Sequence, residues 1–494
     1  MLVLMTTLTL PEFITLPLLS SLGASPEEWA AIPAHIRRNI ERLWDEHQRM
    51  QERLGLTSQN SSLPPSADPP SAPPRPTKPP SARAPGGQPG HPDTQRPLVP
   101  TDQVTEVIAV RPAVCAHCAQ PLPPTLADPA PQRHQVWDIP PLTATVTEYQ
   151  RHTLTCPHCG QRTPTALPPG VPQGGYSARV TALVALLTGQ YHLAKRAVAD
   201  LLTTTSGLPI SAASVSGLET TMSAGLQAPY DAARATVPSA PLKWVDETGW
   251  RQQREPDPDT PLPRGPLPKA WLWTAVTEAV TVFAIRRSRA AKVATELLSA
   301  TPAGIIHTDR HSAYRWLPLH QHQLCWAHLR RDFQKLIDRG GSATPIGTAL
   351  RDASDTLFTL WHRIRDGTLA WEAFPAAMAP VQAAVRAALQ EGATTADKRT
   401  RTFCRILQRL DPALWTFVHV PGAEPTNNRA ERAIRPGVLW RTVSFGTQTS
   451  AGSRFVERVM TAVATCRQHE RNVLTYLTAV ATAGYARTSA PSLL

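Results

Sequence analysis

The chain has 494 residues, a formal net charge of +12 and an isoelectric point near 9.7. This length predicts about three domains, and the abundance of arginine favours a polyanionic partner, because guanidinium groups bind phosphate oxygens bidentately. No apolar run reaches the ~18 residues of a membrane span, and the start, MLVLMTTLTLPEF, lacks the features of a signal peptide. We therefore expect a cytoplasmic protein with no membrane partner.

The N-terminal part divides by composition. Residues 1–25 remain unassigned, and residues 26–56 predict an amphipathic helix of the kind that forms a coiled coil. Its apolar side chains recur at intervals of three and four, at Ile36, Ile40, Leu43 and Trp44. Residues 57–104 are rich in Pro, Ser and Gly with scattered basic residues, which predicts an extended linker. It is either a spacer or a loose contact to DNA.

Residues 105–170 contain two CxxC pairs, CAHC and CPHCG. Their cysteines are Cys115, Cys118, Cys156 and Cys159. The turn in each pair points two thiolates at one ion, and a hairpin in the strand-like interior, VWDIPPLTATVTEYQRHTLT, would bring the pairs together. We predict a structural Zn²⁺ site, with a redox or free-thiol role as the alternative. The other cysteines, Cys325, Cys404 and Cys466, are isolated and are expected to be small buried residues.

Residues 171–240 predict a succession of helices. The segments are SARVTALVALLTGQYH, LAKRAVADLLTTTSG and ISAASVSGLETTMSAGL. The turn between the second and third contains Gly207 and Pro209, which is compatible with a DNA-binding helix-turn-helix and equally with an ordinary helical hairpin.

From residue 241 the pattern changes to strands. Three successive strands are predicted in PLKWVDETGWRQ, KAWLWTAVTE and AVTVFAIRRS. A helix is predicted in RAAKVATELLSA, and a fourth strand in GIIHTDRHSAY. This order opens an RNase H-like α/β fold, which we assign to residues 241–324 and 421–484. Residues 325–420 predict a helical insertion. One long last helix is predicted in FVERVMTAVATCRQHERNVLTYLTAVAT, and residues 485–494 are assigned to a tail. The protein is thus expected to be multidomain.

Three acids fall at positions where this fold would bring them together. Asp246 lies in the first strand, Asp309 ends the fourth, and Glu431 lies in the basic segment EPTNNRAERAIRP. Carboxylates converging from different elements are typical of two-metal phosphodiester chemistry with Mg²⁺ or Mn²⁺. The alternative for Glu431 is an ordinary surface ion pair with Arg435, four residues on. Glu247 points to the opposite face of its strand and is not expected to be a ligand.

The same segments resemble the IS66 family of insertion-sequence transposases, which are DDE-type enzymes. The matching stretches are QNSSLPPSADPP, GGQPGH, CAHC…CPHCG, VDETGW, TDRHSAY, CWAHLRRDF, EPTNNRAERAIRP and WRTVSFGTQTSAGSRF. The resemblance implies that Asp246, Asp309 and Glu431 are the metal-binding catalytic triad. One departure is His311, where the family usually has an aromatic residue.

The resemblance also implies an activity and its partners. Such enzymes bind the inverted ends of their element, free the 3′ hydroxyls by hydrolysis and transfer them to target DNA. The resemblance therefore implies double-stranded DNA as the main partner, bound by a homo-oligomer. It also implies companion proteins of the same element and a location at the nucleoid. Candidate DNA contacts are Arg330, Arg331, Arg435, Arg441 and Arg454. A non-catalytic DNA-binding repressor and a structure-specific nuclease without end joining are the alternatives.

Overall fold

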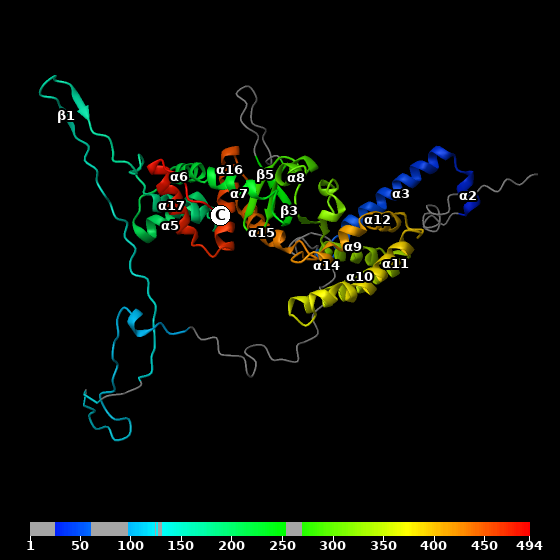
Figure 1. Cartoon of the computed structure of the whole chain (residues 1–494), viewed down its shortest axis with the longest axis horizontal. Coiled ribbons are helices and arrows are strands. Elements are labelled where there is room, and N and C mark those ends of the chain that lie inside the picture. Colours follow the sequence, from blue (N-terminus) through cyan, green and yellow to red (C-terminus); the bar gives the residue numbers. More distant parts are fainter. Residues whose placement is uncertain (1–24, 61–96, 124, 127–130, 253–268) are drawn as a thin grey trace, which may run out of the picture. The chain divides into compact units, whose positions relative to one another are not determined.

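The computed structural model describes residues 25–60, 97–123, 125–126, 131–252 and 269–494 (Figure 1). Residues 1–24 and most of the predicted linker, 61–96, lie outside the described residues, and with them the stretches SLPPSADPP and GGQPG. The chain divides into two units, one of residues 1–73 and 145–494 and the other of residues 74–144, which are described separately.

A mixed five-stranded sheet forms the centre of the larger unit, in the order β5-β4-β3-β6-β7. The strands are β3 (Leu242–Arg251), β4 (Lys269–Val276), β5 (Thr281–Arg286), β6 (Ile305–Thr308) and β7 (His322–Leu324). The first three are antiparallel, whereas β6 pairs in parallel with β3 and β7 in parallel with β6. The four predicted strands and the helix α8 (Ala291–Leu298) before β6 are present. The fifth strand, β7, was not predicted, because three residues carry too little periodicity.

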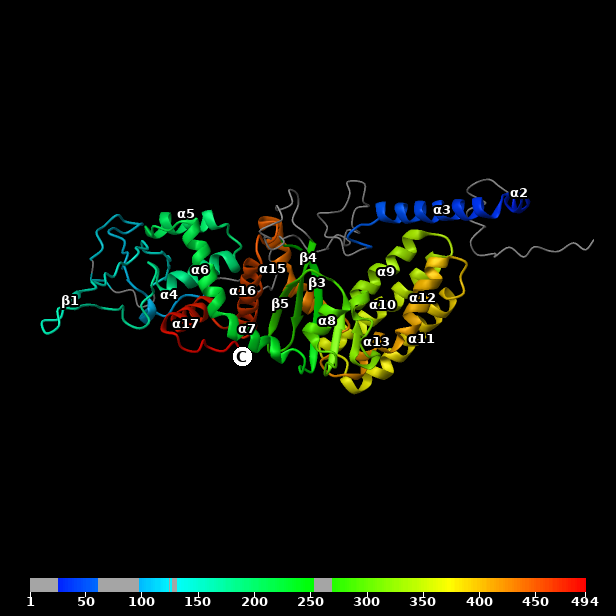
Figure 2. The ribbon, with the colours of Figure 1, turned by 90° about the horizontal axis from the view of Figure 1, so that it is seen from above.

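Helices enclose one side of the sheet (Figure 2). α15 (Asn428–Ser444) packs on β3 and β4, and α16 (Ser450–Gln468) packs on β5. The other helices of this group are α4 (Ala178–Gly189), α5 (Lys195–Ser206), α6 (Ala212–Gly225), α7 (Gln227–Thr236) and α17 (Val473–Ala486). All of them except α5 bury one large apolar cluster together with the sheet, and α5 packs on α4 and α6 in a smaller cluster that contains Val198 and Leu202. Gly437 of α15 allows a close approach, because a Cβ there would lie 2.3 Å from Cδ2 of Leu272.

The prediction of one long last helix is wrong. α16 ends at Gln468, and α17 begins after Asn472. Glu470 between them adopts a positive φ of 54°, a conformation that a helix interior does not allow. The side chain of Asn472 then caps α17 by accepting the backbone N–H of Thr475.

Residues 325–420 form a second group of helices. These are α9 (Trp326–Arg339), α10 (Ala343–Arg365), α11 (Phe374–Gly392), α12 (Lys398–Arg409), α13 (Asp411–Leu414) and α14 (Thr416–His419). They share a second apolar cluster that includes Trp244 and Leu324 of the sheet. The sheet is therefore covered by two groups of helices, and the segment carrying Glu431 returns to it from the second.

The predicted N-terminal helix is interrupted. α2 (Pro26–Ala31) and α3 (Ala34–Leu54) are separated at Ile32 and Pro33, because Pro33 cannot donate the hydrogen bond that a continuous helix needs. Trp29 of α2 is buried against Ile32, Ile40 and Trp44. No helix within the described ranges is long and apolar enough to cross a membrane.

The strand-like interior between the CxxC pairs was overestimated. Only a short hairpin forms in residues 145–172, from β1 (Thr153–Thr155) and β2 (Arg162–Pro164). Residues 136–152 have no regular secondary structure, although their sequence is rich in β-branched residues. Side chains such as Val146 and Ile139 are exposed there, so no apolar face stabilises a sheet.

Replacing Gly304 by Ala is expected to destabilise the protein strongly. Gly304 precedes β6 with a φ of +65°, and an added Cβ would lie 2.1 Å from the backbone oxygen of Pro241. The left-handed conformation costs an ordinary residue about 1–2 kcal/mol, and overlap with backbone adds roughly 1–3 kcal/mol. Gly367→Ala is the matched control, since Gly367 has a φ of +76° and no atom within 4 Å of an added Cβ. Thermal unfolding should show the larger loss for Gly304→Ala, and equal losses would contradict this close approach of β6 to β3.

Candidate functional site

Asp246 and Asp309 lie on neighbouring parallel strands. Trp244 of β3 is opposite His307 of β6. Continuing this register by two positions places Asp309, just after β6, opposite Asp246 of β3. Residues in this relation project to the same face of a sheet. Oδ1 of Asp309 also accepts the backbone N–H of His311 at 2.8 Å, which orients its carboxylate.

Glu431 lies in the first turn of α15, and the residue before that helix ties it to the sheet. Asn427 is fully buried, and its Nδ2 donates to the backbone oxygen of Val245 at 2.7 Å. Its backbone N–H donates to Sγ of Cys325 at 3.2 Å. Because Val245 precedes Asp246, these bonds bring Glu431 close enough for its charge to raise the pKa of Asp246.

A buried histidine fixes the preceding segment. The ring of His307 stacks on Trp244 at 4.6 Å, and its Nδ1 lies 2.8 Å from the backbone oxygen of Lys243. Its Nε2 accepts the backbone N–H of Glu424 at 3.1 Å. Burial lowers the pKa of His307 to about 3, so the ring is neutral and can accept this bond. The guanidinium of Arg429 lies 4.2 Å from the centre of the Trp244 ring, and its Nε lies 2.8 Å from Oε1 of Glu424. These two contacts also hold the segment before α15 against the sheet.

The three acids form a region of unbalanced negative charge. Burial raises the pKa of Asp246 well above its ordinary value, and the charges of Glu247, Asp309 and Glu431 raise it further. Carboxylates that repel one another in this way are stabilised by a shared cation, and oxygen donors suit Mg²⁺ or Mn²⁺. By their chemistry, the three carboxylates suit a hard divalent ion.

Glu247 is engaged by other side chains. Its Oε1 lies 2.6 Å from Nε of Arg289 and 3.7 Å from Nδ1 of His311, and Tyr314 donates its hydroxyl to Oε2. Burial and the charge of Asp309 raise the pKa of Glu247 to about 7, against the opposing effects of Tyr314 and Arg289. A guanidinium nitrogen of Arg289 also lies 4.0 Å from Oδ2 of Asp309. Glu247 thus anchors Arg289 beside the acids.

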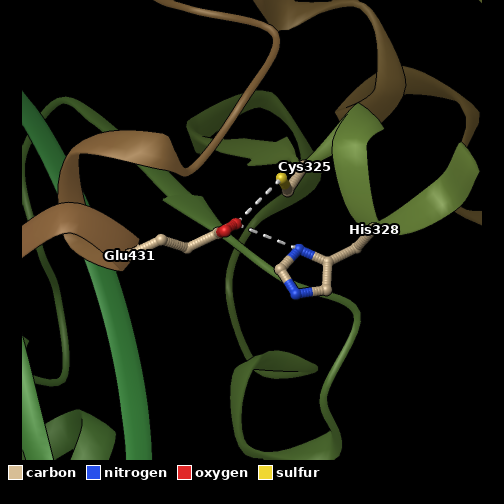
Figure 3. A group of neighbouring side chains, drawn as sticks. All are labelled: Cys325, His328 and Glu431. Carbon is tan, nitrogen blue, oxygen red and sulfur yellow. Dashed lines mark hydrogen bonds and ion pairs between the residues drawn. The ribbon is translucent and has the colours of Figure 1, made fainter. Parts of the chain in front are cut away.

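Two residues that the sequence analysis left without a role contact Glu431 (Figure 3). Cys325 occupies the N-cap position of α9 without a side-chain capping bond, and His328 lies three residues further on. Sγ of Cys325 lies 3.9 Å and Nδ1 of His328 lies 3.5 Å from Oε1 of Glu431. Burial raises the pKa of the Cys325 thiol to about 12. The CxxH spacing at a helix start was the signal that could have indicated this pair.

The predicted DNA-contacting arginines fall into two groups. Arg330 pairs with Asp355 and lies over the ring of Phe358, and Arg441 donates to Oγ1 of Thr248 at 2.8 Å. Nη2 of Arg330 and Nη1 of Arg441 are therefore used within the fold, whereas Nε of Arg330 has no hydrogen-bond partner among the described residues.

The guanidinium groups of the second group of arginines have no acidic partner among the described residues. Arg435 and Arg454 are exposed, Arg331 is half-buried, and none of the three forms an ion pair with a described residue. Arg454 lines a pocket at the start of α16 together with Gln252 and Arg458. These three arginines remain available to phosphate groups.

The two CxxC pairs adopt the same local turn. The backbone N–H of Cys115 donates to Gln120 at 2.9 Å, and that of Cys156 donates to Gln161 at 2.8 Å. Backbone N–H groups within each turn lower the pKa of the first cysteine of each pair, Cys115 and Cys156, which favours the thiolate that binds metal. Cys115 and Cys118 belong to the smaller unit and Cys156 and Cys159 to the larger.

Two regions of the chain match known protein families of transposases. Residues 173–454, more than half of the chain, match the family described as "Transposase IS66 family". The chain belongs to the IS66 transposase family. Residues 112–160 match the zinc-finger binding domain of transposase IS66, and residues 15–97 match a family of unknown function. The zinc-finger match spans both CxxC pairs and supports structural zinc.

The region that matches the IS66 transposase family includes all three acids, Asp246, Asp309 and Glu431. The chain is also similar to an uncharacterized protein, y4qI, of Sinorhizobium fredii, with 26% identity over 240 residues. That alignment covers 43% of this chain and 43% of the relative, so it spans less than half of the relative's length.

Replacing Asp246 by Asn is expected to raise the melting temperature of the metal-free protein at neutral pH. Because the folded-state pKa of Asp246 is raised, its contribution to stability is complete below the unfolded pKa of about 4. It is lost as pH rises towards the folded value. Each ~1 kcal/mol recovered should add roughly 2–4 °C. Mg²⁺ should raise the melting temperature of the wild type and have little effect on the variant.

Asp352→Asn, at an exposed position on α10, is the control for this measurement. It removes one carboxylate outside the acid cluster and should change neither the metal-free melting temperature nor the response to Mg²⁺. An identical response of wild type and Asp246→Asn to Mg²⁺ would contradict a metal role for Asp246.

Proposed function

We propose that this protein is a DNA transposase that binds the terminal inverted repeats of its element, cleaves their 3′ ends and joins them to target DNA. The proposal is supported by Asp246 of β3, Asp309 directly after β6 and Glu431 of α15, which lie close enough together for their charges to interact. The three-strand meander followed by a helix and a parallel strand supports an RNase H-like core.

We assign separate tasks to the successive regions. Residues 105–170 form a zinc module in which Cys115, Cys118, Cys156 and Cys159 hold one structural Zn²⁺, and residues 171–240 form a helical DNA-binding region. Residues 241–324 and 421–484 form the catalytic core, with the helices of residues 325–420 inserted between Asp309 and Glu431. In this division residues 171–240 bind DNA away from the acids, and the catalytic core and its insertion add phosphate contacts beside them.

In the proposed reaction, water attacks a phosphorus at the element end and the bond to the 3′ oxygen breaks, which leaves a free 3′ hydroxyl. That hydroxyl then attacks a phosphorus of target DNA and displaces a target 3′ oxygen. Two Mg²⁺ or Mn²⁺ ions, when bound, would activate the attacking oxygen and stabilise the leaving one. Asp246, Asp309 and Glu431 would hold them, with Asp246 on β3, the strand that pairs with β6 and contacts α15.

The remaining residues would position the substrate and the acids. Arg331, Arg435 and Arg454 would hold backbone phosphates, because their charge is not used within the described fold. Asn427 would keep Glu431 at the sheet through its bond to Val245. Synapsis of two DNA ends calls for a homo-oligomer on double-stranded DNA, with companion proteins of the element as further partners in the nucleoid.

Glu431→Gln is expected to abolish both end cleavage and strand joining while leaving DNA binding intact. The substitution keeps the shape of the side chain and removes the charge that a metal ligand needs. The measurement incubates the full chain with Mg²⁺ and DNA carrying the terminal repeats of its element, and scores nicked and joined products on a gel. The loss should be at least about 100-fold, as is typical for groups that stabilise developing charge.

Glu470→Gln is the matched control, because Glu470 is an exposed glutamate in the turn after α16. It should cleave and join as the wild type does. Cleavage without joining in the wild type would favour a structure-specific nuclease. Specific binding with no cleavage by the wild type, in the presence of any companion proteins, would favour a DNA-binding repressor and contradict the proposal.

A further inference from the structure

The cluster of Cys325, His328 and Glu431 has the composition of a metal site different from the acid cluster. One ligand atom from each residue, a sulfur, an imidazole nitrogen and a carboxylate oxygen, lies within 4.8 Å of the others (Figure 3). Cys325 and His328 come from the start of α9, and Glu431 comes from the first turn of α15. Two helices therefore present three donors to one point.

These distances are close to those of a tetrahedral zinc site. With bonds of about 2.3 Å to sulfur and 2.0–2.1 Å to nitrogen or oxygen, tetrahedral ligands lie roughly 3.3–3.6 Å from one another. Nδ1 of His328 lies 3.5 Å and Sγ of Cys325 lies 3.9 Å from Oε1 of Glu431. The first distance falls within this range and the second needs a shift of a few tenths of an ångström, while the ligand atoms of Cys325 and His328 lie within 4.8 Å of each other.

The alternative is that Cys325 and His328 only orient Glu431 by hydrogen bonds. Nδ1 of His328 is buried and has no hydrogen-bond partner among the described residues, which is costly for a polar atom. Its 3.5 Å separation from Glu431 is long for a charge-assisted hydrogen bond. An atom in this position, directed at a carboxylate and a sulfur, is better explained as a ligand.

We propose that Cys325, His328 and Glu431 form a second divalent-cation site that takes softer ions of the zinc class and shares Glu431 with the catalytic metal site. Binding replaces the Cys325 S–H proton, which leaves to solvent, with a sulfur–metal bond. Thiolate and imidazole select zinc-class ions over Mg²⁺, whereas three carboxylates select Mg²⁺ or Mn²⁺. Three protein ligands leave a fourth position open for water or substrate oxygen.

The shared ligand gives the site a regulatory consequence. An ion held by Cys325 and His328 draws the Glu431 carboxylate towards α9, so that it competes with the ion that Asp246 and Asp309 hold. Zinc-class ions are therefore expected to inhibit Mg²⁺-dependent cleavage. This consequence rests on the proposed function, whereas the metal site itself rests only on its own geometry.

The test uses Co²⁺ as a spectroscopic probe of the full chain, after saturation with Zn²⁺ and removal of loosely held zinc. Wild-type protein should bind Co²⁺ and develop sulfur-to-cobalt charge-transfer absorption. Cys325→Ser should remove that absorption, and His328→Gln should weaken Co²⁺ binding by at least about tenfold, the effect of ~1.4 kcal/mol. Cys404→Ser, at a buried cysteine of α12, is the matched control and should keep the wild-type spectrum.

The inference is overturned if the wild type shows no such absorption, or if Cys325→Ser and His328→Gln both leave it unchanged. The partly exposed setting of His328 makes His328→Gln informative even if Cys325→Ser fails to fold. As a second measurement, Zn²⁺ should inhibit cleavage by the wild type at lower concentration than by His328→Gln, each compared with its own zinc-free rate. Absence of cleavage at any metal composition would count against the proposed function, and the Co²⁺ spectra would then decide the metal site by themselves.

Discussion

The parallel pairing of β3 with β6 is the contact on which the candidate site depends. Its register, continued two positions past Trp244 and His307, places Asp309 opposite Asp246, although the two residues are distant in sequence. The pairing requires a close approach at Gly304, where the chain passes against the backbone of Pro241 without a Cβ between them. The strand order thus creates a cluster of like charge at the end of β6, and the remaining features hold that cluster together.

Like charges in a partly buried place oppose folding, so the elements that carry them must be fixed by other bonds. The start of α15 is held by Asn427, which bonds to Val245 and Cys325, and by the neutral His307, which bonds to Glu424. The two bonds of Asn427 are buried and that of Glu424 is partly buried, and hydrogen bonds keep their strength where water is excluded. They position the third acid without neutralising it, and this leaves the negative charge available to a cation.

Much of the architecture could be predicted from sequence because its signals are local. The strands around Asp246 and Asp309 have apolar runs with clear ends, and the CxxC pairs define a metal module. The breaks at Pro33 and Glu470, the irregular segment between the CxxC pairs and the short strand β7 were missed, since packing and single backbone conformations decide them.

The residues of the site that were not predicted from sequence were missed for the same reason, because tertiary packing decides their contacts. The relation of Cys325 and His328 to Glu431 depends on α9 and α15 meeting in space, which spacing along the chain does not reveal. The internal partners of Arg330 and Arg441 are likewise tertiary contacts, with Asp355 and Thr248. Residue types indicated the chemistry, and the fold determined which residues are available for it.

The central claim is that Asp246, Asp309 and Glu431 form one pocket for hard divalent ions. Crystals of the full chain grown with Mn²⁺, measured at the manganese absorption edge, test it most directly. The account predicts anomalous density bonded to all three carboxylates, at metal–oxygen distances of about 2.0–2.2 Å. Manganese bound elsewhere, or held by Glu247 in place of these acids, would contradict it.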